Sequence, residues 1–144
     1  MNIGLLNGPN LNMLGVREPS IYGTTTLNEI VKKLEDMAKP HKIISYQSNI
    51  EGEIVNFLQK TKENNLEYVI FNPAAYSHYS IAIRDAISLS SSKVIEVHIS
   101  NIYAREEFRN NSIISPVCIG VISGFGIDSY YIALNYILNQ SKVV

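Results

Sequence analysis

Apolar and polar positions follow two alternating patterns along the chain. Short apolar runs predict five β-strands, which cover residues 3–6, 42–48, 67–71, 93–100 and 117–123. Between these runs, apolar residues recur every three or four positions, as on the buried face of a helix. Strand and helix patterns therefore alternate along the whole chain, which is typical of an α/β domain.

The helical spacing predicts four helices. Thr26 and Glu29 form a capping box before the first, which carries Leu27 on its apolar face, and Ser80 caps the third. The second is predicted over residues 51–65, and Asp128 opens the closing helix. A helix between successive strands is the connection that parallel strands need.

The third and fifth predicted strands contain almost no polar residues, which indicates a parallel sheet covered by helices on both faces. Right-handed crossovers then favour a doubly wound, flavodoxin-like fold with strand order 2-1-3-4-5. We expect one domain that spans residues 1–144. Ligands of such a sheet bind beyond the carboxyl ends of the strands, at the point where the strand order reverses.

Composition and charge narrow the range of partners. The 144 residues are 46% apolar and carry a net charge of −1 without a run of like charge, so we expect a small polar ligand, with no nucleic acid and no membrane. The one cysteine, Cys118, lies in the apolar run 117–123 and is predicted to be a buried structural thiol within a strand. A single cysteine and the lack of a signal-peptide pattern favour a cytoplasmic protein.

Polar residues gather at and after the ends of three predicted strands. The first strand is followed by a long loop, GPNLNMLGVREPSIYG, that is too rich in Gly, Pro and Asn to be helix or strand. The residues expected at this edge of the sheet are Asn7, Asn10, Arg17, Tyr22, Asn72, Ser77, His78, Glu96, His98, Ser100, Arg105 and Arg109. His41 falls at the opposite edge and is predicted to be a surface residue.

Some of these groups also have an ordinary structural explanation. Residues 7–10 (NGPN) are as typical of a simple turn as of a binding site. Glu96 and His98 share one face of an apolar strand, where an unpaired charge is unfavourable. They form either a structural pair or a functional one, and their position at the ligand-binding end of the sheet favours function.

Arg105 and Arg109 are four residues apart and have two glutamates between them. On a helical turn the two arginines would share one side, so they form either a binding pair or part of a solvated ion-pair helix. Both alternatives remain open on the sequence alone.

The residue types exclude several kinds of chemistry. The chain has neither a G-x-S-x-G nucleophile elbow nor a G-x-x-x-x-G-K phosphate loop, and its histidines are not at metal-ligand spacing. What remains is a histidine oriented by a glutamate, a tyrosine near an arginine, and amide donors for an oxyanion. This set suits removal of a proton beside a carbonyl, followed by loss of a hydroxyl.

Four ordered motifs carry a resemblance to a known family. NGPNLNMLGVREPSIYG, QSNIEGEIV, FNPAAYSHYSIAIRDA and EVHISNIYAREEFR together resemble type II 3-dehydroquinate dehydratase. The resemblance implies a flavodoxin-like enzyme of the shikimate pathway that needs no cofactor, no metal and no Schiff base. It also implies anti dehydration of 3-dehydroquinate to 3-dehydroshikimate through an enolate, and a homododecamer of four trimers.

The same resemblance implies a catalytic role for five residues. Tyr22 would be the base that takes the proton beside the ketone, and Arg17 would favour its phenolate form. Asn10 would hold the enolate oxygen through a bound water. His98 would protonate the departing hydroxyl, and Glu96 would orient the ring of His98.

Binding roles also follow from the resemblance. The residues implied in substrate binding are Asn72, His78, Ile99, Ser100, Arg105 and Arg109, together with Asp85 from a neighbouring subunit. Among them, Ser100 would hold the substrate carboxylate. The long loop, bracketed by Gly15 and Gly23, would act as a lid. Asn110 and Asn111 replace histidines that the family commonly has.

Two other functions are weighed against this one. A flavodoxin-like module for flavin or another phosphate ligand would need a glycine-rich or hydroxyl-rich loop after the first strand, and GPNLNML has one glycine. A catalytically silent scaffold subunit would be expected to lack Tyr22, Arg17 or His98, and all three are present.

Overall fold

A five-stranded parallel sheet forms the centre of the molecule. The computed structural model describes residues 1–16, 20 and 23–140, so the predicted site residues Arg17 and Tyr22 lie outside the described residues. The strands are β1 (Asn2–Asn7), β2 (Lys42–Gln47), β3 (Leu66–Asn72), β4 (Lys93–His98) and β5 (Gly120–Ser123). All neighbouring pairs are parallel in the order β2–β1–β3–β4–β5, which confirms the predicted topology.

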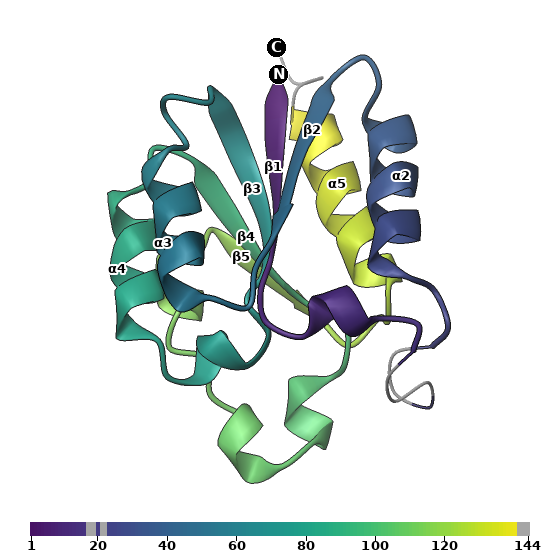
Figure 1. Ribbon diagram of the computed structural model, residues 1–144, viewed down its shortest axis with the longest axis vertical. Coiled ribbons are helices and arrows are strands. Elements are labelled where there is room, and N and C mark those ends of the chain that lie inside the picture. The colour runs from purple at the N-terminus through teal and green to yellow at the C-terminus, as the bar shows by residue number, and fades with distance from the viewer. Residues whose placement is uncertain (17–19, 21–22, 141–144) are drawn as a thin grey trace.

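Helices cover both faces of this sheet, as predicted. They are α2 (Leu27–Ala38), α3 (Glu51–Gln59), α4 (Ile81–Leu89) and α5 (Asp128–Gln140). Figure 1 shows α2 and α5 on one face and α3 and α4 on the other. Each pair of helices closes an apolar core, with Leu34 and Leu134 in one and Ile54 and Ile83 in the other, all fully buried.

Helix boundaries follow the predicted caps at the amino ends. The Thr26 hydroxyl accepts the amide of Glu29, and the Ser80 hydroxyl accepts the amide of Ile83. The prediction for the second helix was too long, because α3 ends at Gln59 and turns follow. Asn65 takes a φ of +54° just before β3, in the left-handed region that asparagine tolerates and a helix does not contain.

The fifth strand is shorter than predicted. Residues 115–117 form a 3₁₀ helix that contains Pro116, whose fixed φ and missing amide suit a helix start rather than a strand. Cys118 therefore lies outside the sheet and is half-buried, so the prediction of a thiol within a strand was wrong. Burial and the nearby charge of Glu96 raise the pKa of this thiol to about 12, which keeps it neutral.

In the part of the chain that the structure describes, every helix is too short or too polar to cross a lipid bilayer.

Candidate active site

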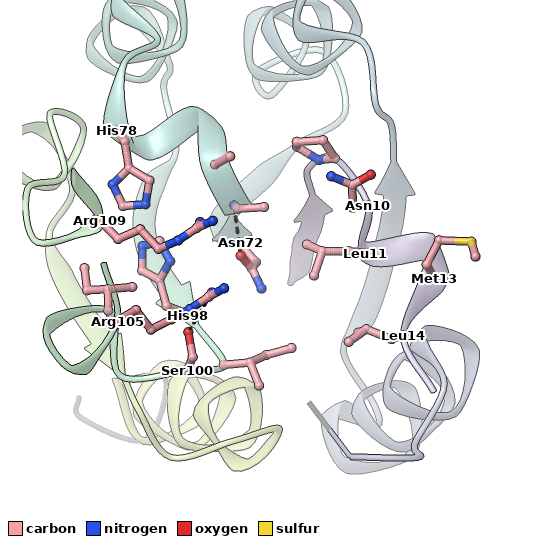
Figure 2. Close-up of a pocket in the computed structure, with 15 residues that line it drawn as sticks. Asn10, Leu11, Met13, Leu14, Asn72, His78, His98, Ser100, Arg105 and Arg109 are labelled. Carbon is pink, nitrogen blue, oxygen red and sulfur yellow. Dashed lines mark hydrogen bonds between the residues drawn. The ribbon is translucent and has the colours of Figure 1, made fainter. Parts of the chain in front are cut away.

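A pocket of about 110 Å³ opens at the carboxyl ends of β1, β3 and β4, where the strand order reverses. Most predicted site residues line it, namely Asn10, Asn72, His78, His98, Ile99, Ser100, Arg105 and Arg109. Figure 2 shows the histidines and arginines on one wall and the loop after β1 on the other, with Asn72 between them. The sequence therefore located the pocket and most of its polar lining.

Other predicted residues lie elsewhere. Glu96 is completely buried beneath the pocket wall, where it contacts His98. Asp85 is exposed on α4 and does not line the pocket of its own chain. Ser77 is buried, and its hydroxyl donates to the carbonyl of Ala74, which indicates a structural role in the turn after β3.

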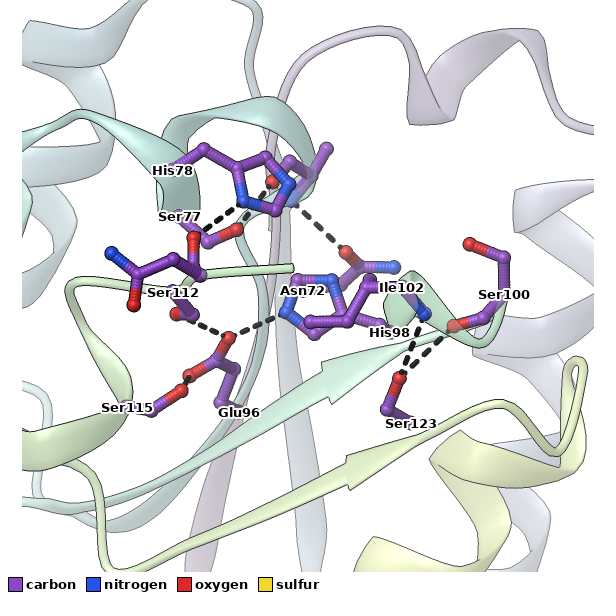
Figure 3. Close-up of polar contacts among 12 residues, drawn as sticks. Asn72, Ser77, His78, Glu96, His98, Ser100, Ile102, Ser112, Ser115 and Ser123 are labelled. Atoms are coloured by element: carbon purple, nitrogen blue, oxygen red, sulfur yellow. Dashed lines mark hydrogen bonds and ion pairs between the residues drawn. The ribbon is translucent and has the colours of Figure 1, made fainter. Parts of the chain in front are cut away.

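Glu96 and His98 form a buried pair at the end of β4. Residues two apart on a strand share a face, and Nε2 of His98 lies 2.5 Å from Oε2 of Glu96. The glutamate also accepts hydrogen bonds from the hydroxyls of Ser112 and Ser115, at 2.8 and 2.5 Å (Figure 3). Burial disfavours the charged carboxylate, but the contacts with His98 and both serines outweigh it and lower the pKa of Glu96.

His78 completes the histidine side of the pocket. It ends the 3₁₀ helix Ala74–His78, and its ring stacks on that of His98 with centroids 6.4 Å apart. Nδ1 of His78 lies 2.9 Å from the backbone oxygen of Asn111 and donates to it. Because the acceptor is a backbone carbonyl, this hydrogen bond does not depend on which side chain stands at position 111.

A buried polar chain connects the pocket to α5. The hydroxyl of Tyr130 donates to Oδ1 of Asn7 at 2.6 Å and accepts from Nδ2 of Asn72 at 2.9 Å. Oδ1 of Asn72 accepts the amide of Ala74 at 3.1 Å. The carboxamide of Asn72 is therefore held at both ends, in one orientation toward the pocket.

The NGPN segment is both a turn and a pocket wall. Gly8 donates its amide to the carbonyl of Asn72, and a Cβ at this position would come within 2.6 Å of the carbonyl oxygen of Pro73. Only glycine lets the loops after β1 and β3 approach so closely. Asn10 takes a left-handed φ of +69°, donates its amide to Asn49, and lines the pocket.

The two arginines are not on one helix. Separate 3₁₀ helices cover Ile102–Ala104 and Glu107–Arg109, and Arg105 lies between them. Both arginines approach the exposed Glu106, at 3.8 Å for Arg105 and 3.1 Å for Arg109, and both line the pocket. The prediction of a shared helical turn was wrong, and so was the ion-pair helix. The arginines still make ion pairs with Glu106, and their role as a binding pair stays a prediction.

Sequence reasoning missed three polar residues that hold the site together. Ser112 and Ser115 bind Glu96, and Tyr130 binds Asn72. A buried glutamate and a buried asparagine must have partners, and that requirement was a usable signal. The sequence offers many serines and nine tyrosines, so it could not indicate which of them supply the bonds.

The arrangement suits acid–base chemistry on a small polar molecule. A buried carboxylate orients a histidine whose other ring nitrogen is available to exchange a proton, and two guanidinium groups supply positive charge beside it. Within the described ranges, no three His, Cys, Asp or Glu side chains gather closely enough to hold a metal ion.

Comparison with known proteins gives a consistent result. The family model described as dehydroquinase class II matches residues 1–138. A 3-dehydroquinate dehydratase of Caldicellulosiruptor saccharolyticus is 52% identical over 132 residues, which is 90% of this chain and 91% of that protein. A 3-dehydroquinate dehydratase of Clostridium perfringens is 46% identical over 144 residues, 99% of this chain and 100% of that protein.

Solved structures give the same result at the level of the fold. The type II dehydroquinase of Butyrivibrio crossotus superposes with a TM-score of 0.92 at 44% identity, covering 96% of this chain and 97% of that chain. The type II dehydroquinase of Propionibacterium acnes gives 0.91 at 41% identity, with 96% of each chain covered.

Proposed function

This chain belongs to the dehydroquinase class II family, and on that premise we propose that it removes water from 3-dehydroquinate to give 3-dehydroshikimate in the shikimate pathway. The observation that carries the proposal is the buried Glu96–His98 pair beside a pocket lined by Arg105 and Arg109. That site offers a proton donor and positive charge in one small space, which suits an anionic substrate that must lose a hydroxyl.

His98 is the general acid in this proposal. With Nε2 on Glu96, the other ring nitrogen gives its proton to the departing hydroxyl, which leaves as water when the carbon–oxygen bond breaks. The ionised Glu96 stabilises the positive imidazolium and fixes the plane of the ring. The stacked ring of His78 restricts the motion of His98 from the other side.

Tyr22 is the base and Arg17 its activator. The phenolate takes the proton from the carbon beside the ketone, and the electron pair becomes an enolate that later expels the hydroxyl. Asn10 holds the enolate oxygen through a water, and its place on the wall opposite His98 supports this role (Figure 2). The proposed enolate-binding residue and the proposed acid then face the substrate from opposite walls, which suits anti elimination.

The remaining pocket residues bind the substrate. Ile99 and Ser100 offer backbone amides and a hydroxyl to the substrate carboxylate, and they follow β4 directly. The residues that bind the ring hydroxyls are Asn72, His78 and Arg109, with Arg105 beside them. Hydrogen bonds to Asn72 and His78 from elsewhere in the chain hold both side chains ready for this task.

We also propose that the chain acts as a homododecamer of four trimers in the cytoplasm. Asp85 is exposed on α4 rather than in its own pocket, which suits a residue that reaches the site of a neighbouring subunit. Light scattering should then detect a trimer or a larger assembly, and dissociation should reduce activity. A fully active monomer would refute this assembly.

The reaction is proposed to need no imine, metal or cofactor. The residues that line the pocket in the described part of the chain include no lysine that could form a Schiff base. The test follows the absorbance of the conjugated enone when purified protein meets 3-dehydroquinate, with EDTA, or with borohydride added together with substrate. Activity should appear and survive both treatments; a lack of product would contradict the proposed function, and loss under either treatment would contradict the mechanism.

A further inference from the structure

The segment 111–115, which follows the Glu107–Arg109 helix, contacts His78 and also Glu96, the partner of His98. Asn111 accepts the Nδ1 proton of His78 through its backbone carbonyl. Ser112 donates its hydroxyl to Oε2 of Glu96, the oxygen that also contacts His98, and Ser115 donates to Oε1. Each oxygen of the carboxylate therefore receives a hydroxyl from this short segment (Figure 3).

A carboxylate in this position needs such donors. Glu96 is fully buried in the sheet, and its register neighbours on β3 and β5 are the apolar Phe71 and Val121. Burial of a charge without hydrogen bonds is unfavourable by several kcal/mol, so a carboxyl here would bind a proton instead. A protonated Glu96 would no longer stabilise the imidazolium of His98.

We propose that Ser112 and Ser115 are positioning residues: their hydroxyls hold the carboxylate of Glu96 ionised, with Oε2 directed at His98, so that His98 can act as the acid. The inference rests on the proposed dehydration, in which His98 supplies the proton. It assigns to two half-buried serines a role in the pH dependence and the turnover of the reaction, and no contact with substrate.

Few of the described residues could take over this task. Among them, the titratable groups around the carboxylate are His98 on β4, Cys118 beyond Ser115, and His78, which stacks on His98. Arg105 and Arg109 lie beside His98 in the pocket (Figure 2), and their ion pairs are with Glu106. Cys118 keeps its proton at neutral pH because its pKa is raised to about 12, and the charge of Glu96 contributes to that rise.

The first test is kinetic. Ser112→Ala and Ser115→Ala should each lower kcat about tenfold, in the range expected for a hydrogen bond to a charged group, with KM changed by less than about twofold. The acid limb of the kcat profile should move to higher pH, because a carboxyl with fewer donors binds a proton more readily. Ser115→Thr keeps the hydroxyl and should restore much of kcat.

Ser92 supplies a matched control. Its half-buried hydroxyl donates to the carbonyl of Leu66 at 2.5 Å, near the amino ends of β3 and β4. Ser92→Ala removes a hydroxyl hydrogen bond at the other end of the sheet and should leave kcat, KM and the pH profile unchanged. A similar loss in Ser92→Ala and Ser115→Ala would show a general structural effect and overturn the inference.

The decisive experiment combines each serine substitution with Glu96→Gln in a double variant. The neutral amide that this substitution introduces has no charge for the hydroxyls to stabilise, so Ser112→Ala or Ser115→Ala should cost much less activity in this background than in the wild type. An equal cost in both backgrounds would contradict the inference. So would a wild-type rate and pH profile in both single serine variants.

A readout without catalysis separates this inference from the proposed function. In protein labelled with ¹³C-glutamate, the carboxyl signal of Glu96 is the one missing from Glu96→Gln. Its titration should move to higher pH in both serine variants and stay in place in Ser92→Ala. An inactive wild type would refute the function alone, whereas an unchanged Glu96 titration would refute the role of the serines.

Discussion

The two ends of the sheet carry similar residue types in different surroundings. At the amino end, His41 lies beside the N-terminal amine, with Nδ1 2.9 Å from it. At the carboxyl end, His98 is buried and contacts an equally buried glutamate. The difference teaches that a buried charged partner, more than the residue type, distinguishes a histidine suited to proton transfer.

The pockets at the two ends of the sheet also differ in the side chains that line them. The one at the amino end encloses about 520 Å³, and the described residues that line it include Lys62 and Lys93 but no histidine. Lys93 lies over the ring of Tyr68. The pocket at the carboxyl end encloses about 110 Å³ and gathers two histidines and two arginines. Converging polar side chains therefore locate the candidate site better than volume does.

The largest expected effect tests the two histidines directly. His98→Asn should lower kcat by about 10² to 10⁴-fold, the usual range for a positioned proton donor, because the asparagine side chain cannot supply the proton. His41→Asn is the matched change at the amino end and should leave turnover unchanged. Steady-state assays of both variants make the comparison, and near-wild-type turnover in His98→Asn would mean that its pair with Glu96 is structural.

The next effect concerns the loop after β1. A phenolate base near neutral pH requires a tyrosine pKa well below the ordinary value of about 10, and an exposed ion pair supplies under about 1 kcal/mol of the roughly 4 kcal/mol needed. The proposed role of Arg17 therefore requires a larger contribution than an exposed pair gives, so Arg17→Ala should lower kcat at least about tenfold and move the rise of the pH–rate profile to higher pH.

Lysine at this position separates charge from shape. Arg17→Lys keeps the positive charge but loses the planar set of donors, so it should recover only part of the rate. Unchanged rate and pH optimum in Arg17→Ala would mean that Arg17 does not activate Tyr22, and another base would have to be sought.

An effect smaller than that of His98→Asn is expected for Glu96→Gln, about ten- to a hundredfold in kcat, because the residue acts through His98. Glu96 should also make the stability of the wild-type fold depend on pH. The folded pKa of Glu96 is below its ordinary value of 4.5, so the ionised group stabilises the fold above that pH, and this contribution is lost as pH falls through the folded pKa. Urea denaturation should show the wild type losing more stability than Glu96→Gln as the pH falls below about 4.5, whereas parallel curves would contradict the assignment.

The smallest effect is expected at the buried polar chain. Tyr130→Phe leaves Oδ1 of Asn7 without its donor and Nδ2 of Asn72 without its acceptor, which should reduce the free energy of unfolding by about 1 to 3 kcal/mol. KM should rise a few-fold because Asn72 is less firmly oriented. Tyr136→Phe on the exposed side of α5 is the control, and equal effects of the two changes would refute the role of Tyr130.

Much of the fold could be predicted because local patterns agree with the final packing. The spacing of apolar residues predicted the order of helices and strands, and the rule of right-handed crossovers predicted the strand order. Together they indicated the edge of the sheet at which the pocket lies. Glu96 and His98 stood out because charged residues within an apolar strand need an explanation. Their partnership at the end of β4 is what the structure contains.

The remainder depends on contacts between distant segments. Val117 and Cys118 looked like strand residues by hydrophobicity, but Pro116 and the loop beside Glu96 decide their conformation. Ser112 and Tyr130 became partners of buried polar groups through tertiary packing, at separations of 16 and 58 residues. Periodicity describes one element at a time and carries no information about such pairs.

The central claim is that His98 supplies the acid and a different residue, Tyr22, supplies the base, and isotope exchange in His98→Asn tests it most directly. In D₂O, this variant should still remove the proton beside the ketone and return deuterium, because Tyr22 and the enolate-binding side are intact, while loss of water is blocked. Mass spectrometry of recovered 3-dehydroquinate should therefore find deuterium at that carbon with little 3-dehydroshikimate formed. Loss of exchange in step with loss of dehydration would contradict the division of roles between these two residues.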